Sequence, residues 1–127
     1  AIIDWINIMA YDAGSSFDPL GAFDCYRIYY GGVLYLGFQP GVQGWGGHLT
    51  TEAEVKKHTE YVKAADVKHG IFVWCHGKTG TPNATQIMAM TWGILNAGAV
   101  PPPVIVPPPV SVVDMTCPVC KTGYKRV

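Results

Sequence analysis

The chain has 127 residues, 49% of them hydrophobic and 14% charged, and its 9 Lys and Arg balance 9 Asp and Glu. This length suits one domain and excludes two large ones. The net charge is zero and no run of Lys and Arg is longer than a pair such as Lys125-Arg126, so we expect neither nucleic acid nor an anionic membrane as a partner. No window approaches the roughly 18 to 20 apolar residues of a bilayer span. The start at Ala1, without Met or a basic signal region, predicts a soluble piece of a longer protein.

The first 96 residues predict three strands that alternate with three helices. In chain order these are a strand over 2–11, a helix over 19–30, a strand over 33–38, a helix from Thr51 to about 65, a strand over 70–74 and a helix from Thr81-Pro82 to about 95. Asp18-Pro19 is a helix start, and Gly31-Gly32 a stop. Thr51 and Glu54 have the spacing of a capping box.

Proline content separates this α/β domain from the end of the chain. Residues 97–113 hold two runs of three prolines and no charge, which predicts an extended polyproline II linker. We therefore expect a domain over 1–96, a Pro-rich linker over 97–113 and a short, truncated Cys-containing module over 114–127.

The predicted strands belong to a sheet larger than three strands. Strands joined through helices pair in parallel by right-handed crossovers, and three of them alone leave two unpaired edges. Both a doubly wound sheet and an eight-stranded barrel fit this order. The first strand has one apolar face and one mixed face, the latter with Trp5, Asn7, Met9 and Tyr11. If the mixed face points into the interior of a closed barrel, its polar residues favour the TIM (β/α)8 barrel. The carboxyl ends of the strands would then lie at its active site.

Three blocks, in chain order, resemble one family. The run DWINIMAYD (residues 4–12) resembles the sixth strand of glycoside hydrolase family 18, the chitinase family, which closes with Met-x-Tyr-Asp. Residues 36–40 and 43–48 resemble the seventh strand and the loop after it, and residues 70–74 resemble the eighth strand with its Trp. The resemblance covers residues 1–96 and implies the C-terminal β-α repeats, about strands 6 to 8, of a TIM (β/α)8 barrel.

The resemblance implies hydrolysis of β-1,4-linked N-acetylglucosamine polymers by a retaining mechanism, in which the acetamide of the substrate attacks the anomeric carbon. Tyr11 matches the hydroxyl that orients this acetamide, and Asp12 matches the carboxylate beside it. Met9 would pack under the acetamide, and Trp74 would form the floor under the distorted sugar. Taken singly, each of these residues is more often structural.

Further candidates are weaker. Gln39 is positioned to hydrogen-bond sugar hydroxyls, and Trp45 between glycines is either a stacking platform or a plug of the barrel end. His48 and His76 border the predicted mouth, where a structural role is the better expectation. Cys75 and His76 point to opposite faces of a strand, which is poor geometry for one metal, so we expect no metal and no other cofactor.

The catalytic acid of the family is missing from this sequence. The resemblance implies an Asp-x-x-Asp-x-Asp-x-Glu motif on the fourth strand, and none of the 127 residues match it. We therefore expect the chain to be inactive as given, because the acid would lie upstream. Two alternatives stay open: a non-catalytic chitin-binding lectin with the same fold, and an unrelated doubly wound domain in which Tyr11 and Trp74 do not share a pocket.

The end of the chain carries Cys117 and Cys120 in one C-x-x-C pair, which fits either a disulfide module or half of a zinc site. Asn83-Ala84-Thr85 matches the N-glycosylation pattern. With the resemblance to secreted chitinases, this pattern predicts an extracellular protein. Its expected partner is chitin or a chito-oligosaccharide, and we expect a monomer at full length.

Overall fold

The computed structural model describes residues 2–14, 16–44, 48–97, 115–116 and 123–124. Its elements are β1 (Trp5–Ile8), α1 (Pro19–Tyr29), β2 (Val33–Phe38), α2 (Glu52–Ala65), β3 (Gly70–Val73), α3 (Ala84–Leu95), β4 (Met115–Thr116) and β5 (Gly123–Tyr124). The predicted alternation of three strands and three helices is confirmed. The last two strands form an antiparallel pair. The linker from residue 98 on, and Cys117 and Cys120, lie outside the described residues.

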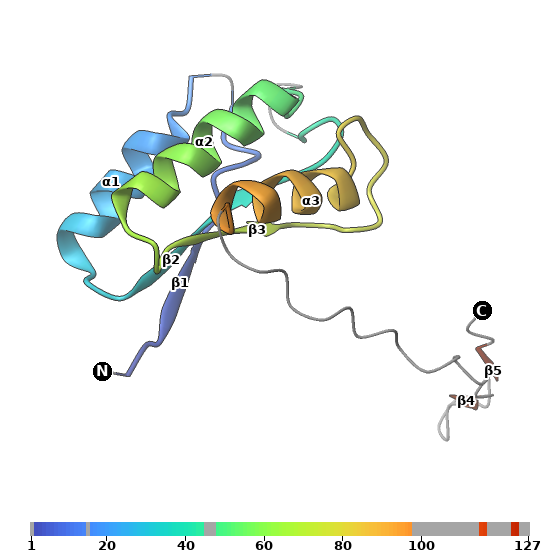
Figure 1. Ribbon diagram of the computed structural model, residues 1–127. Helices are drawn as coiled ribbons and strands as arrows, with labels where there is room; N and C mark the ends of the chain where they lie inside the picture. The colour runs from blue at the N-terminus through green and yellow to red at the C-terminus, as the bar shows by residue number, and fades with distance from the viewer. Residues whose placement is uncertain (1, 15, 45–47, 98–114, 117–122, 125–127) are drawn as a thin grey trace.

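The first three strands form a parallel sheet in the order β1-β2-β3. The register pairs Ile8 with Leu36, and Leu36 with Ile71. α1 connects β1 to β2, α2 connects β2 to β3, and α3 follows β3. Figure 1 shows the three helices gathered on one side of the sheet. Right-handed crossovers between successive neighbouring strands place the helices on one side in this way.

The core lies between the sheet and its helices. Ile8, Leu34 and Leu36 pack with Phe23 of α1 and Val62 of α2. A second cluster joins the end of β2 to α2 and α3 through three side chains: Phe38, Val55 and Ile87. Each such fully buried apolar side chain contributes roughly 1.5 to 3 kcal/mol. The apolar face predicted for the first strand is therefore the helix-covered face.

The opposite face of the sheet has no covering layer within the described residues. Trp5, Met9 and Trp74 are exposed large side chains of β1 and of the segments after β1 and β3. Parallel sheets normally have both faces covered. Within the described residues, this face therefore carries exposed apolar side chains.

Two predicted boundaries were wrong. The first strand spans Trp5–Ile8 and not residues 2–11. Its pairing with β2 ends at Ile8 and Leu36, and the Ala10 N–H then bonds locally to the Ile8 carbonyl. The last helix begins at Ala84 and not at the Thr81-Pro82 pair. Asn83 caps it, with its side chain accepting from Gln86 N–H. None of the described helices is long and apolar enough for a membrane span.

Candidate functional site

The carboxyl ends of the three parallel strands bring three loops together at one edge of the sheet. Tyr11 and Asp12 follow β1, Gln39 follows β2 and Trp74 follows β3. The Trp74 N–H donates to the Phe38 carbonyl (2.8 Å), which ties the end of β3 to the end of β2. Ligands of parallel α/β sheets bind at this edge, so it is the first place to look for a site.

Tyr11 and Trp74 are in contact at this edge. Their ring centroids lie 6.3 Å apart with planes inclined by only 15°. The Tyr11 ring also meets Phe72 edge-on, at 6.1 Å and 68°. Tyr11 is only 8% exposed, whereas Trp74 keeps 54% of its surface exposed. The structure thus places the two predicted residues side by side, with the Tyr11 phenol buried and the Trp74 indole exposed.

A glycine makes room for this aromatic group. A Cβ built on Gly37 of β2 would lie 2.7 Å from the Tyr11 ring and 2.6 Å from the Phe72 ring. Such distances are shorter than any real Cβ contact, so one ring would have to move. The sequence motif pointed to Tyr11 and Trp74 but not to Gly37, whose role depends on the strand register.

The Tyr11 hydroxyl is buried and has no hydrogen-bond partner among the described residues. A buried hydroxyl without a partner costs roughly 1 to 3 kcal/mol. Burial raises the pKa of the Tyr11 phenol above 10.0, and the nearby Asp12 carboxylate adds to the effect. The group therefore stays protonated at neutral pH and is a donor that lacks an acceptor.

Asp12 is held in an unusual conformation by the loop after β2. Its φ is 56°, in the left-handed region that Asp tolerates better than most residues. Its backbone N–H donates to Gln43 Oε1 (2.8 Å), and its carboxylate accepts from Gly44 N–H. The carboxylate is thus fixed beside Tyr11 by groups of a different loop.

Gln39 is 2% exposed and contacts Asp12 rather than solvent. With its amide oriented to match its neighbours, its nitrogen donates to Asp12 Oδ2 (2.9 Å) and its oxygen accepts from Lys78 Nζ. Thr50 donates its hydroxyl to the Gln39 carbonyl (2.8 Å) and accepts from Gln43 Nε2 (3.4 Å). Gln43, Thr50 and Lys78 were not singled out from the sequence, because only the paths of the loops bring them to Asp12 and Gln39.

The other predicted residues are placed apart from this network. Met9 is exposed on the uncovered face, just beyond the end of β1. Trp45 lies outside the described residues. His48 forms an ion pair with Glu54 of α2 (2.9 Å), and His76 is exposed. The geometry thus groups Tyr11, Asp12, Gln39 and Trp74.

Neither a metal cluster nor a relative adds to this description. In the part of the chain that the structure describes, no three His, Cys, Asp or Glu residues lie close enough together to hold a metal ion. Comparison of the chain with protein-family models, with curated proteins and with solved structures found no match.

Proposed function

We propose that residues 1–96 are the C-terminal part, about strands 6 to 8, of a TIM (β/α)8 barrel of the family 18 chitinase type, which hydrolyses β-1,4-linked N-acetylglucosamine polymers with retention. The observation that carries the proposal is the contact between Tyr11 and Trp74, 6.3 Å apart at the carboxyl edge of a parallel sheet. The resemblance in sequence assigns both residues to one sugar site, and they meet at the edge where barrel enzymes bind substrates.

The one-sided arrangement of the helices supports the barrel. In a (β/α)8 barrel all helices lie outside, and the inner faces of the strands pack against each other. Here all three helices lie on one side, and Trp5 and Met9 are exposed on the other. The remaining strands of the barrel would cover this second face.

The chemistry assigned to each residue follows from its surroundings. The protonated Tyr11 hydroxyl would donate to the acetamide oxygen and hold it for attack on the anomeric carbon. Asp12, oriented by Gln39 and Gln43, would place negative charge near the cationic oxazolinium intermediate. Trp74 would offer its flat face to the axial C–H groups of the sugar, and Met9 would pack under the acetamide.

Substrate entry requires one local movement. A centroid distance of 6.3 Å is that of direct aromatic contact, so no pyranose fits between Tyr11 and Trp74. The exposed Trp74 ring is the one with space to turn outward. Its movement would uncover the Tyr11 hydroxyl and give that buried donor its acceptor.

The proton donor belongs to another part of the proposed barrel. The acidic motif of the fourth strand does not occur in the 127 residues, so the proposal assigns the catalytic Glu to sequence outside them and predicts that this chain alone is inactive. General acid catalysis typically contributes about 10²- to 10⁴-fold. The proposal further describes an extracellular monomer that acts on chitin or chito-oligosaccharides without metal or organic cofactor.

The test is the substitution Tyr11→Phe in the complete barrel protein, assayed on N-acetylchitotetraose. Loss of the hydroxyl should lower kcat by about 100-fold or more, while the dissociation constant of the oligosaccharide changes far less. Tyr61→Phe, which removes the hydroxyl that donates to Asp24, is the matched control and should leave turnover unchanged. Unchanged turnover in Tyr11→Phe would contradict the proposal, as would binding without any hydrolysis, the behaviour of a lectin.

A further inference from the structure

The segment that leads into α3 carries a motif that the proposed function leaves without a role. Asn83-Ala84-Thr85 is the only Asn-x-Ser/Thr sequence among the 127 residues, and its middle residue is not Pro. The other two asparagines, Asn7 and Asn96, have neither Ser nor Thr two positions later. Such a motif accepts N-linked glycans in proteins that enter the secretory pathway, so the surroundings of Asn83 decide whether this fold can carry one.

The two residues that define the motif lie at the surface. Asn83 and Thr85 are exposed, whereas Ala84 between them is buried. Ala84 and Ile87 lie three positions apart on the buried face of α3, which leaves the polar residues on its outer side. A glycan is bulky and hydrated, so in the folded protein only a side chain that faces solvent can carry it. The exposure of Asn83 meets this requirement.

The two polar atoms of the Asn83 amide have different tasks. Oδ1 accepts from the Gln86 N–H (2.9 Å), and Gln86 Oε1 accepts from the Asn83 N–H (2.8 Å) to complete the capping box. An amide nitrogen only donates, so the cap fixes Oδ1 toward the helix and leaves Nδ2 outside the capping box. An N-glycosidic bond forms at Nδ2 and keeps the amide carbonyl. The oxygen can therefore still cap α3 when the nitrogen carries a sugar.

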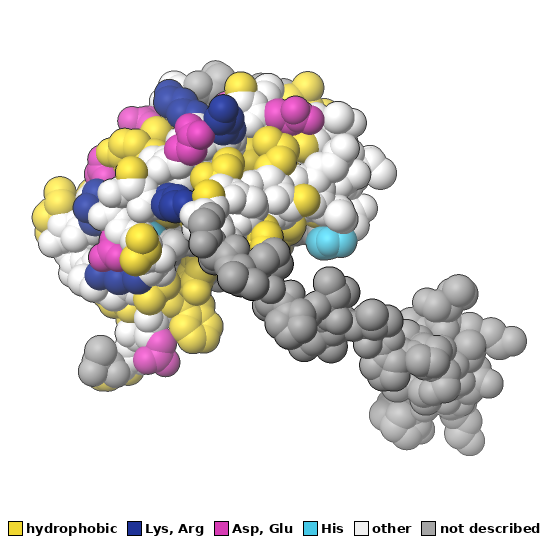
Figure 2. All heavy atoms as spheres, viewed as in Figure 1, with side chains coloured by type: hydrophobic (Ala, Val, Ile, Leu, Met, Phe, Trp, Pro, Cys, Tyr) yellow, Lys and Arg dark blue, Asp and Glu magenta, His cyan; other side chains and the backbone are white. Residues whose placement is uncertain are grey.

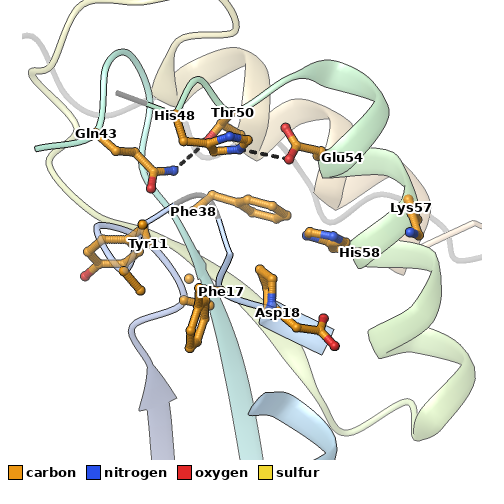
Figure 3. Close-up of a pocket in the computed structure, with 15 residues that line it drawn as sticks. Tyr11, Phe17, Asp18, Phe38, Gln43, His48, Thr50, Glu54, Lys57 and His58 are labelled. Carbon is orange, nitrogen blue, oxygen red and sulfur yellow. Dashed lines mark hydrogen bonds and ion pairs between the residues drawn. The ribbon is translucent and has the colours of Figure 1, made fainter. Parts of the chain in front are cut away.

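Asn83 is separate from the cavity beside the candidate site. Figure 3 shows this cavity, which Tyr11 and Gln43 line together with residues of α2. None of its described lining residues comes from α3 or from the loop between β3 and α3. A sugar on Asn83 Nδ2 is therefore not attached to a wall of that cavity.

We propose that Asn83 is an N-glycosylation site, modified on Nδ2 when the chain passes through the secretory pathway, and that its Oδ1 continues to cap α3 in the modified protein. In the transfer, Nδ2 forms a bond to the anomeric carbon of a lipid-linked oligosaccharide. The bond from that carbon to the polyprenyl diphosphate breaks, and the diphosphate leaves with the electron pair. Nδ2 loses one proton, and no group is oxidised or reduced. The inference rests on one part of the proposed function, the extracellular location, and not on the hydrolysis of chitin.

The experiment is translation of the 127-residue chain, with a cleavable secretory signal placed ahead of Ala1, in the presence of endoplasmic reticulum microsomes. The translocated chain should gain one glycan, seen as a mobility shift on a gel that peptide-N-glycosidase removes. Asn83→Asp keeps an oxygen that can cap the helix, and Thr85→Ala keeps Asn83 itself, yet both should abolish the shift. Asn96→Gln is the matched control and should keep the shift, because Asn96 lies outside the motif. The gel readout does not require the chain to fold.

The retained cap is tested by thermal melts of the glycosylated chain after its glycan is trimmed to one N-acetylglucosamine. This form should melt at the temperature of the unmodified chain. Asn83→Ala removes the cap and should melt about 4 to 8 °C lower. A trimmed chain that melts as low as Asn83→Ala would refute the continued capping by Oδ1.

Two results of the gel experiment would overturn the site itself: a parent chain that is protected from protease inside the microsomes but shows no mobility shift, or a shift that survives in Asn83→Asp. None of these readouts involves chitin. Failure here therefore leaves the proposed chitinase site standing, and unchanged turnover in Tyr11→Phe leaves the glycosylation site standing, so the two failures are distinguishable.

Discussion

At the scale of single residues, the site depends on a position that has no side chain. Gly37 lies under the rings of Tyr11 and Phe72, and their contact with each other and with Trp74 requires that empty space. A glycine inside a strand is otherwise unfavourable, because it costs backbone entropy and packs nothing. Its presence near the end of β2 is explained by the aromatic rings that approach it.

Gly37→Ala should therefore disturb the site and the fold together. The added methyl would meet the two rings at 2.6 and 2.7 Å, and overpacking of this kind costs about 1 to 3 kcal/mol. We expect a lower urea midpoint and a changed near-ultraviolet circular dichroism signal from the separated Tyr11 and Trp74 rings. Gly77→Ala is the control, since a Cβ there meets nothing within 4 Å. Equal midpoints for both variants would show that the rings do not constrain position 37.

The sequence allowed Tyr11, Asp12 and Trp74 to be named, because a short motif and the strand order carry them. Their stacking contact and the burial of the Tyr11 hydroxyl could not be read from the motif. Gln43 is a different case, since its contact with the Asp12 backbone joins positions in two loops. Such contacts follow from the path of a loop, which composition and periodicity do not predict.

At the scale of elements, local capping chemistry made the first two helices predictable. Asp18 caps α1, and the Thr51–Glu54 capping box opens α2, as the sequence indicated. The start of α3 was misplaced because Thr81-Pro82 resembles a helix start, while Asn83 with Gln86 forms the actual capping box. In α3 the boundary is set by Asn83, whose side chain accepts from Gln86 N–H.

Two helical glycines should respond differently to alanine. A Cβ at Gly93 in α3 meets nothing within 4 Å, so Gly93→Ala should stabilise the protein by about 0.5 to 1 kcal/mol through helix propensity. At Gly21 in α1 the Cβ would lie 2.6 Å from Oδ2 of Asp18, the carboxylate whose Oδ1 accepts from Leu20 N–H and caps the helix. Gly21→Ala should therefore forfeit most of that gain or destabilise the protein. Thermal melts of both variants decide this, and an equal rise in both would refute the role given to Asp18.

The start of α2 should respond to acid. Burial opposes the ionisation of Glu54, but hydrogen bonds from Thr51 and the charge of His48 outweigh it and lower its pKa below 4.5. Because the folded-state pKa is the lower one, ionised Glu54 stabilises the fold at neutral pH, and this contribution is lost as pH falls from about 4.5 through the lowered value. Glu54→Gln should lose less stability than the parent between neutral pH and pH about 3, measured by urea unfolding. An identical acid dependence in both would contradict this assignment.

At the scale of the whole molecule, the uncovered face of the sheet is the main feature. Among the described residues, the parallel strand order, the helices on one side and the exposed Trp5, Met9 and Trp74 together describe a sheet with one covered and one uncovered face. Figure 2 shows apolar side chains gathered at the lower edge of the molecule, near the start of β1. The sequence predicted the parallel order, because strands alternate with helices. It predicted the mixed face of the first strand as well, through its period of two.

The central claim is that Trp74 and Tyr11 belong to one sugar site, and the most direct measurement is the binding of N-acetylchitotetraose to the complete barrel protein by calorimetry. Trp74→Ala should weaken binding by about 10- to 100-fold, because a sugar loses its stacking surface. Trp92→Ala on α3 is the control, since Trp92 is 51% exposed and Trp74 54%, and it should bind as the parent does. Equal affinities for Trp74→Ala, Trp92→Ala and the parent would contradict the claim.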